Sequence, residues 1–285
     1  MVSKVLRFSE SLFDKLQKIW ENQKVNKVVS NTLVFIFIGS LIISYLDRNK
    51  IISLGGLDDF FSNPFFAIEI AFTLLLILEL LSLIFVLPKS VAKSVGKQFE
   101  VLSLIFIRSG FKEISHIKDF EWHTMTDSLI NLFAYAVGSL IIFVILGFNY
   151  RLQKHNRLTD SENDQSEFIQ TKKLLALFLM IAFIGVGIYD TTFLLETGSY
   201  LHSFHLFYSV LIFSDIIILL IALRYTLNYL KIFRYSAFVL ATLLIRISLT
   251  IPPFYNVIIG VSSALFILLL TVSYNYFLND LSDSK

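Results

Sequence analysis

The feature that most constrains this chain of 285 residues is a series of eight long apolar segments. A bilayer core of about 30 Å is crossed by a helix of about 20 mostly apolar residues, and most of the segments approach or exceed that length. Hydrophobic residues make up 55% of the chain and charged residues only 16%, a composition typical of membrane proteins. We therefore expect an all-α integral membrane protein. The predicted transmembrane helices are residues 31–46, 65–87, 98–110, 128–149, 174–194, 203–223, 235–251 and 254–277.

Several function classes are disfavoured by what the sequence lacks. The chain contains no cysteine, which excludes disulfides, thiolate metal sites and cysteine nucleophiles. A net charge of +2 argues against nucleic-acid binding. The sequence has neither a Gly-rich phosphate loop nor a Gly-x-Ser-x-Gly elbow. We expect a protein that is not an enzyme and needs no cofactor, and a membrane-embedded enzyme is the least favoured class.

A further helix is expected before the first span. The apolar residues Phe8, Leu12 and Ile19 recur among charged residues at helical spacing, which predicts a helix with one apolar face. We interpret residues 3–28 as an amphipathic helix that lies at the membrane surface, within an N-terminal region 1–28. The alternative is a helix that packs on the cytoplasmic loops.

Composition divides the rest of the chain into two units, a linker and a tail. The linker is polar, with five basic and four acidic residues, and is expected to be cytoplasmic. The predicted parts are a first four-helix unit at 29–150, the linker at 151–173, a second four-helix unit at 174–277 and the tail at 278–285.

The distribution of basic residues predicts the orientation in the membrane. With a cytoplasmic N-terminus, eighteen of the 24 Lys and Arg residues fall on the cytoplasmic side and four on the other. Cytoplasmic loops of membrane proteins carry such an excess. We therefore expect a multi-pass protein of the bacterial inner (plasma) membrane whose N- and C-termini are both cytoplasmic.

The two predicted units resemble each other in their intramembrane charges. Glu79 in the second predicted helix corresponds to Asp215 in the sixth, and Arg108 in the third corresponds to Arg246 in the seventh. The acid and the arginine are 29 residues apart in the first unit and 31 in the second. Because each unit has an even number of helices, both units enter and leave on the same side, and the internal repeat is parallel.

These four charged residues are expected to form two buried ion pairs, Glu79 with Arg108 and Asp215 with Arg246. Rise along the helices places each acid and each arginine deep in the membrane, where a lone charge costs about 2.5–3.5 kcal/mol on insertion scales. Pairing a carboxylate with a guanidinium offsets much of that cost. The pairs either lock helix register or take part in a mechanism, and the sequence leaves both interpretations open.

The second unit combines Asp215 with an Arg234-Tyr235 step, an Ile245-Arg246 step and the segment PPFYNVIIGVSSALFILLL. This pattern resembles the phosphate-starvation-inducible PsiE family of small bacterial inner-membrane proteins. The first unit keeps Glu79 and Arg108 but has Gln98-Phe99 where the family tends to have arginine and an aromatic residue. The resemblance implies a membrane location and a link to phosphate limitation, and the tandem arrangement resembles a fused dimer.

Two groups of polar residues complete the prediction. Basic residues form matching collars at the inner face, which are expected to contact anionic lipids, with a phosphate-containing ligand as an alternative; they are Lys89, Lys93, Lys97, Arg224, Lys231 and Arg234. Four histidines lie near the predicted outer face, where ordinary interfacial residues are favoured over metal ligands; they are His116, His123, His202 and His205.

The sequence as a whole indicates a non-enzymatic membrane protein with a regulatory or scaffold role in stress or phosphate limitation, and with a protein partner as an option. The alternative is a small ion or proton pathway in which the acid–arginine pairs gate or relay. A conduit requires a hydrated cavity that reaches Glu79 or Asp215, whereas a scaffold requires a dry interior.

Overall fold

The structure is a computed structural model that describes residues 2–49, 66–89, 91–115, 122–152, 162–197, 204–225 and 228–283. These residues form nine α-helices and no strand. The helices are α1 (Val2–Trp20), α2 (Gln23–Arg48), α4 (Phe66–Val86), α5 (Val91–Ser115), α6 (Trp122–Leu152), α7 (Glu162–Thr197), α8 (Phe204–Tyr225), α9 (Tyr229–Thr250) and α10 (Tyr255–Asp283).

The predicted all-α fold is confirmed. Each of the eight predicted segments falls on one helix, with at most one residue beyond either end. Within the described residues, five helices are long and apolar enough to cross a membrane by length and composition: they lie at Gln23–Asp47, Thr126–Leu152, Asp164–Phe193, Tyr229–Thr250 and Tyr255–Phe277. A shorter apolar helix covers Ile70–Val86.

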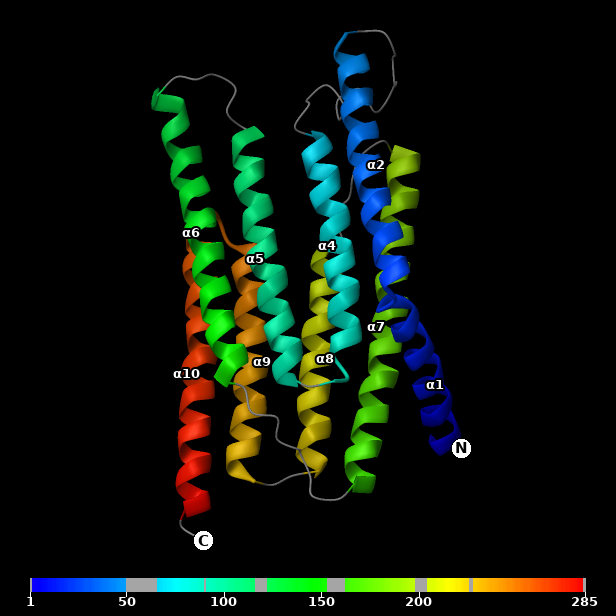
Figure 1. Cartoon of the computed structure of the whole chain (residues 1–285), viewed down its shortest axis with the longest axis vertical. Coiled ribbons are helices and arrows are strands. Elements are labelled where there is room, and N and C mark those ends of the chain that lie inside the picture. The colour runs from blue at the N-terminus through cyan, green and yellow to red at the C-terminus, as the bar shows by residue number, and fades with distance from the viewer. Residues whose placement is uncertain are drawn as a thin grey trace.

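The helices after α1 alternate in direction along the bundle and form two quartets. The first quartet is α2, α4, α5 and α6, and the second is α7, α8, α9 and α10 (Figure 1). Within each quartet every helix contacts the next, and the quartets meet chiefly where α5 contacts α9 and α6 contacts α10. Corresponding helices run in the same direction, and the N- and C-terminal ends lie at the same end of the bundle (Figure 1).

Side-chain hydrogen bonds show directly that α6 and α10 run parallel. Asn256 Nδ2 donates to Tyr135 Oη at 3.2 Å, and Thr271 Oγ1 donates to Asn149 Oδ1 at 2.8 Å. Further along, Asn275 Nδ2 donates to a backbone carbonyl of α6 at 2.6 Å. Residue numbers rise together along both helices, so the last helices of the two quartets point the same way.

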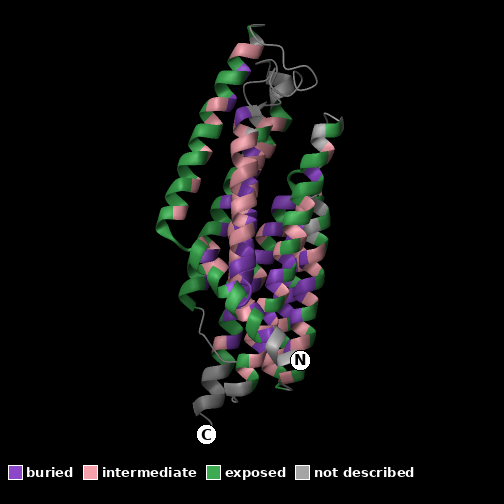
Figure 2. Ribbon diagram, turned by 90° about the vertical axis from the view of Figure 1, so that its right-hand side faces the viewer, coloured by how far each residue is buried: buried purple, intermediate pink, exposed green. Residues whose placement is uncertain are grey.

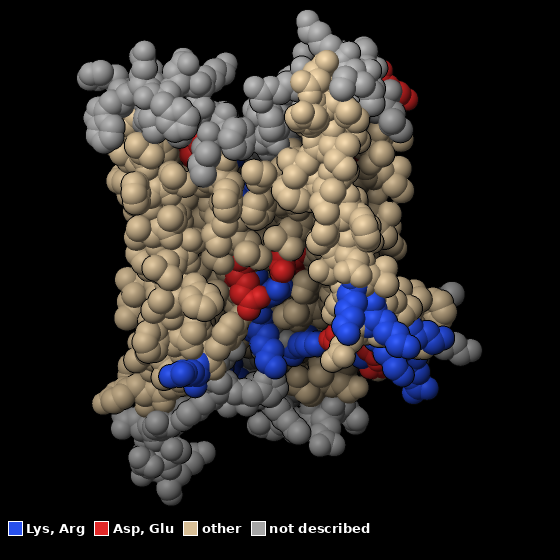
Figure 3. Space-filling view, turned by 45° about the horizontal axis from the view of Figure 1, so that its top comes forward, with Lys and Arg blue, Asp and Glu red and all other residues tan. Residues whose placement is uncertain are grey.

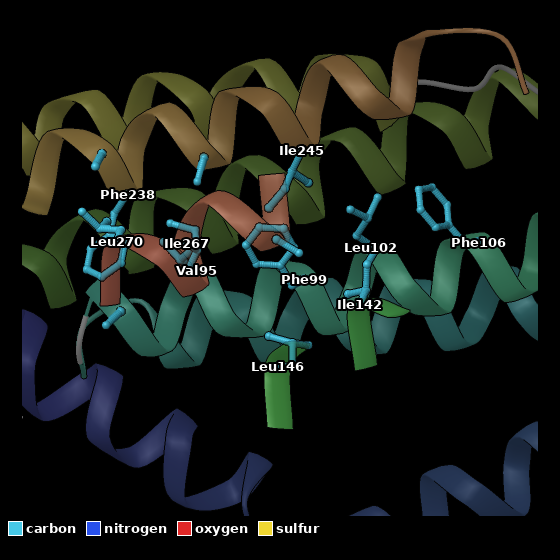
Figure 4. Close-up of a cluster of buried hydrophobic side chains, with 14 of the residues drawn as sticks. Val95, Phe99, Leu102, Phe106, Ile142, Leu146, Phe238, Ile245, Ile267 and Leu270 are labelled. Atoms are coloured by element: carbon cyan, nitrogen blue, oxygen red, sulfur yellow. The ribbon is translucent and has the colours of Figure 1, made fainter. Parts of the chain in front are cut away.

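The interface between the quartets is an apolar core drawn from four helices. Figure 4 shows side chains of α5, α6, α9 and α10 packed together. Phe99 of α5 lies beside Ile245 of α9 and near Leu146 of α6 (Figure 4). Phe99 is fully buried, with no exposed surface. Such close packing fixes the distance and the rotation at which the two quartets meet.

The N-terminal helix differs from the prediction in its bounds and its surroundings. Asn22 ends α1 by capping the next helix, because its side chain accepts a hydrogen bond from the backbone N–H of Lys24 at 2.9 Å. Phe13 is 1% exposed and packs with Phe85 of α4 and Phe168 of α7. One face of α1 therefore packs on helices α4 and α7 rather than on loops.

The second half of the predicted linker is helical, because α7 begins at Glu162. This extension is stabilised by α1: Gln170 Nε2 donates to Glu10 at 2.9 Å, and Lys173 Nζ lies 2.9 Å from carboxylate oxygens of both Glu10 and Asp14. Polar composition alone indicated a linker. The partners that make this stretch helical are more than a hundred residues away in sequence.

The outer surface of the bundle is apolar along most of its length. Exposed residues predominate on α2 and on the outer sides of the other helices (Figure 2). They include Phe35, which is 74% exposed, and Phe143, which is 71% exposed. An apolar surface of this extent is typical of helices that face lipid rather than water.

Candidate functional site

The strongest candidate site contains two consecutive residues of α5 whose side chains contact different parts of the bundle. Lys97 and Gln98 are neighbours in sequence, and successive side chains of a helix point about 100° apart. Gln98 is 2% exposed and points into the bundle, whereas the Lys97 side chain is 18% exposed and lies at the surface between helices. Each of them contacts one of the two acids singled out in the sequence.

Gln98 joins Asp215 and Arg246 in the interior. Its Nε2 donates to Asp215 Oδ2 at 3.4 Å, and its Oε1 accepts from Arg246 Nη2 at 3.1 Å. An uncharged amide side chain can donate through its nitrogen and accept through its oxygen at the same time. The contacts link α5 of the first quartet to α8 and α9 of the second, and we call these three residues the polar bridge.

All three residues of the polar bridge are buried, which makes their mutual contacts necessary. Asp215 is 7% exposed and Arg246 is 5% exposed. The positive charge of Arg246 acts on the Asp215 carboxylate. Burying either charge without the other would be costly. The structure thus brings together Asp215 and Arg246, which the sequence predicted as a pair, and adds Gln98 between them.

Glu79 belongs to a second polar cluster, at the surface. Its carboxylate lies 2.5 Å from Lys97 Nζ, and Lys97 also pairs with Glu100 at 2.9 Å. Tyr150 Oη of α6 donates to Glu100 at 2.7 Å. Figure 3 shows acidic and basic side chains gathered in a hollow near the middle of one face of the molecule. This cluster joins α4, α5 and α6, all within the first quartet.

A glycine makes room for the tyrosine of this cluster. A Cβ atom added to Gly96 would come within 2.7 Å of the Tyr150 ring. Any larger residue at position 96 would therefore displace the ring from α5. The glycine lets the hydroxyl reach Glu100, so it supports the surface cluster sterically.

The predicted pair of Glu79 and Arg108 is corrected by these contacts. Lys97 holds the Glu79 carboxylate, and Arg108 lies eleven residues further along α5, about 16 Å at the rise of a helix. The sequence analysis placed Lys97 outside the predicted span 98–110, in the cytoplasmic loop before it. Because α5 begins at Val91, Lys97 is already within the helix and closer to Glu79.

The basic collars are largely engaged with protein groups. Lys89 pairs with Glu21 at 2.7 Å, and the guanidinium of Arg234 lies 4.5 Å from the centre of the Tyr274 ring. Arg224 lies 4.0 Å from Glu167. With Lys97 bound to two carboxylates, four of the six collar residues contact protein groups. Lys93 is exposed and Lys231 is half-buried.

The remaining predicted polar groups lie outside what the structure describes. The side chains of His116, His123, His202 and His205 are among the residues that are not described. Across the described residues, no group of three or more His, Asp or Glu side chains is arranged to hold a metal ion.

Gln98 is the functional residue that the sequence analysis missed. A neutral amide gives no charge signal, and its position at the start of a predicted span made it look like a boundary residue. The one available signal was that Gln98, followed by Phe99, stands where the PsiE-like pattern has an arginine followed by an aromatic residue. The polar bridge consists of hydrogen bonds between buried side chains. Comparison with protein-family models, with curated proteins and with solved structures finds no match to this chain.

Proposed function

We propose that this chain is a non-enzymatic, eight-span membrane protein built from two parallel four-helix units, and that the polar bridge locks the units together. In this proposal the role of the protein is structural or regulatory: it holds a fixed helical platform in the membrane. The single observation that carries the proposal is that Gln98 of α5 binds both Asp215 of α8 and Arg246 of α9 in a buried site.

The duplicated architecture is supported by the direction of the helices. The last helices of the two quartets run parallel, with hydrogen bonds along their length. The corresponding helices α5 and α9 also lie against each other. Two copies of one unit related by an axis along the membrane normal would make such contacts between equivalent helices.

The buried surroundings of the polar bridge favour a fixed contact between the two units over a moving one. The bridge lies beside the apolar core that includes Phe99 and Ile245. Charges that move or exchange protons with water need a hydrated route, whereas each residue of the bridge is less than 9% exposed. A buried polar contact of this kind sets which surfaces meet and in which register.

The second candidate, an ion or proton pathway, is favoured by the surface cluster. Glu79, Lys97 and Glu100 are charged, partly exposed and in mutual contact, as the entrance of an ion or proton pathway would be. A pathway would then have to continue from this cluster to Asp215 in the interior.

Reconstitution in vesicles separates the two functions. The purified chain is placed in proteoliposomes, and proton, sodium and potassium fluxes are measured for the wild type and for the double variant Glu79→Gln with Asp215→Asn. The lock predicts no flux above that of empty vesicles in either case. A flux in the wild type that disappears in the double variant would establish the pathway instead.

The proposed location is the bacterial inner membrane with both termini in the cytoplasm. The two ends of the chain lie at the same end of the bundle, which supports placing both termini on one side of the membrane (Figure 1). The excess of basic residues on that side supports the cytoplasm. Because the chain has no cysteine, a single cysteine introduced at Lys24 can be labelled alone. A membrane-impermeant maleimide should label it in inverted vesicles and leave it unlabelled in intact spheroplasts.

The proposed link to phosphate limitation rests on the resemblance to the PsiE family. It is tested by measuring the amount of this protein in its host with and without phosphate in the medium. A rise on phosphate depletion is expected, and an unchanged amount would remove the link without affecting the structural proposal.

A further inference from the structure

The outer side of α1 carries exposed residues that the fold leaves uncovered. Phe8 is 71% exposed, Leu12 is 40% exposed and Ile19 is 59% exposed. They are four and seven residues apart, so they form one stripe along the helix. This stripe borders the face through which Phe13 packs on the bundle. The apolar arc of α1 is therefore wider than the surface that α4 and α7 cover.

Charges are segregated by sign around the same helix. The acidic residues Glu10, Asp14 and Glu21 share one edge and are all paired, the first two with Lys173 and the third with Lys89. The basic residues Arg7, Lys15 and Lys18 lie on the adjoining outer face, at positions eight and three residues apart. They are exposed, and none of the three forms an ion pair with a described residue.

The contacts of α1 place it at the level where the bundle leaves its apolar zone. Trp20 stacks on Phe85, close to the end of α4, with ring centres 5.5 Å apart. Lys173, which pairs with Glu10 and Asp14, directly precedes an apolar run in α7. Figure 3 shows basic side chains gathered at the lower right, on the side where Figure 1 shows α1 and α2.

We propose that the outer side of α1 binds anionic phospholipids of the adjacent leaflet while its acidic edge stays attached to α7. Phe8, Leu12 and Ile19 would enter the boundary between headgroups and acyl chains, and Arg7, Lys15 and Lys18 would contact lipid phosphates. The occupant is a lipid surface because a basic face beside an apolar stripe complements it, and because α1 leads directly into the apolar helix α2.

This inference goes beyond the locking role of the polar bridge. It assigns the anionic-lipid contact to α1, whereas most of the collar residues are engaged with protein groups. It also explains how one segment combines both interpretations of the N-terminal helix, since one face binds the protein and the other binds the membrane.

The test uses the absence of native cysteine. Leu12→Cys in the full-length chain is labelled with an environment-sensitive fluorophore, and the protein is reconstituted in phosphatidylcholine vesicles with and without phosphatidylglycerol. We expect a blue shift of the emission that needs phosphatidylglycerol and is reversed by high salt, since salt screens surface charge. A label at Ser11, on the basic face, should report water in both kinds of vesicle.

Two matched variants decide whether lipid charge is responsible. The neutral variant Arg7→Gln, Lys15→Gln, Lys18→Gln should lose the shift that depends on phosphatidylglycerol. The charge-conserving variant Arg7→Lys, Lys15→Arg, Lys18→Arg should keep it. Helix content by circular dichroism verifies that both variants are folded.

The inference is overturned by any of three results. One is an emission that is the same in both vesicles, and another is a shift that persists in the neutral variant. The third is a blue shift in detergent alone that grows with protein concentration, which would identify a second copy of the chain as the occupant.

Discussion

Replacing either charge of the polar bridge should destabilise the protein at least as much as replacing both. Asp215→Asn keeps the shape of the side chain and removes the Asp215 charge that acts on Arg246, in a site where Arg246 is 5% exposed. Removing one partner of a buried pair costs about 3–5 kcal/mol in soluble proteins. Arg246→Gln should cost a similar amount, because Asp215 would then be the uncompensated charge.

The double variant isolates the interaction between the two residues. With Asn at 215 and Gln at 246 no charge remains, and Gln98 can still hydrogen-bond to both amides. We expect the double variant to be no less stable than either single variant, although independent effects would sum to about 6–10 kcal/mol. Gln98→Leu should cost about 2 kcal/mol, mostly from the Arg246 contact. Its hydrogen bond of 3.1 Å lies in the normal range, whereas that to Asp215 is long at 3.4 Å.

The assay is a titration of the purified protein in mild detergent with a denaturing detergent, followed by tryptophan fluorescence. Free energies of unfolding for the wild type, the two single variants and the double variant give the coupling energy. If the effects of Asp215→Asn and Arg246→Gln simply add, then the two residues do not interact, and the polar bridge does not hold the quartets together.

Three further predictions concern other contacts. Glu79→Gln should lower the free energy of unfolding by about 1 kcal/mol, as for a partly exposed pair. In double variants this effect should be non-additive with that of Lys97→Gln and additive with that of Arg108→Gln, measured by the same titration. Non-additivity with Arg108→Gln would support the predicted pair of Glu79 and Arg108 instead. Gly138→Ala should lower the free energy of unfolding by about 1–3 kcal/mol through overpacking, because its Cβ would clash with Val257 of α10. Adding Val257→Ala should restore stability, and Gly147→Ala, which has open space around it, should have little effect. The hydrogen bonds from Lys89 and Gln17 hold the pKa of Glu21 below its ordinary value of 4.5. This contact therefore stabilises the packing of α1 above that pH and is lost as the pH falls through the lowered pKa. In a Trp122→Phe protein the Trp20 fluorescence should report this loss, and a Glu21→Gln protein that retains the same acid transition would refute the assignment.

The sequence predicted the helices of the membrane region well because long apolar runs specify them locally. The predicted segment 128–149 lies inside α6 and 174–194 lies inside α7. The helical start of α7 was not predictable from its polar residues. Phe168 is 1% exposed only because α1 and α8 pack around it, and no local pattern indicates such distant partners.

Partners within the membrane were predicted less well than positions. Asp215 and Arg246 both contact Gln98, since α8 and α9 are adjacent and antiparallel. Depth gives the height of a residue along its helix and not the direction in which its side chain points. Because the sequence did not indicate how each helix is rotated about its axis, Lys97 was overlooked as the partner of Glu79. For the same reason Gln98 was not recognised as the link between the quartets.

Cross-linking between α6 and α10 tests most directly that the two quartets run the same way and meet along these helices. Pairs of cysteines are introduced into the naturally cysteine-free chain and treated in membranes with a short bifunctional reagent. The parallel arrangement predicts cross-links for Asn149 with Thr271 and for Tyr135 with Asn256, and none for Asn149 with Asn256 or Tyr135 with Thr271. The reverse pattern would mean that the second quartet is inverted relative to the first, and would contradict both the duplication and the lock.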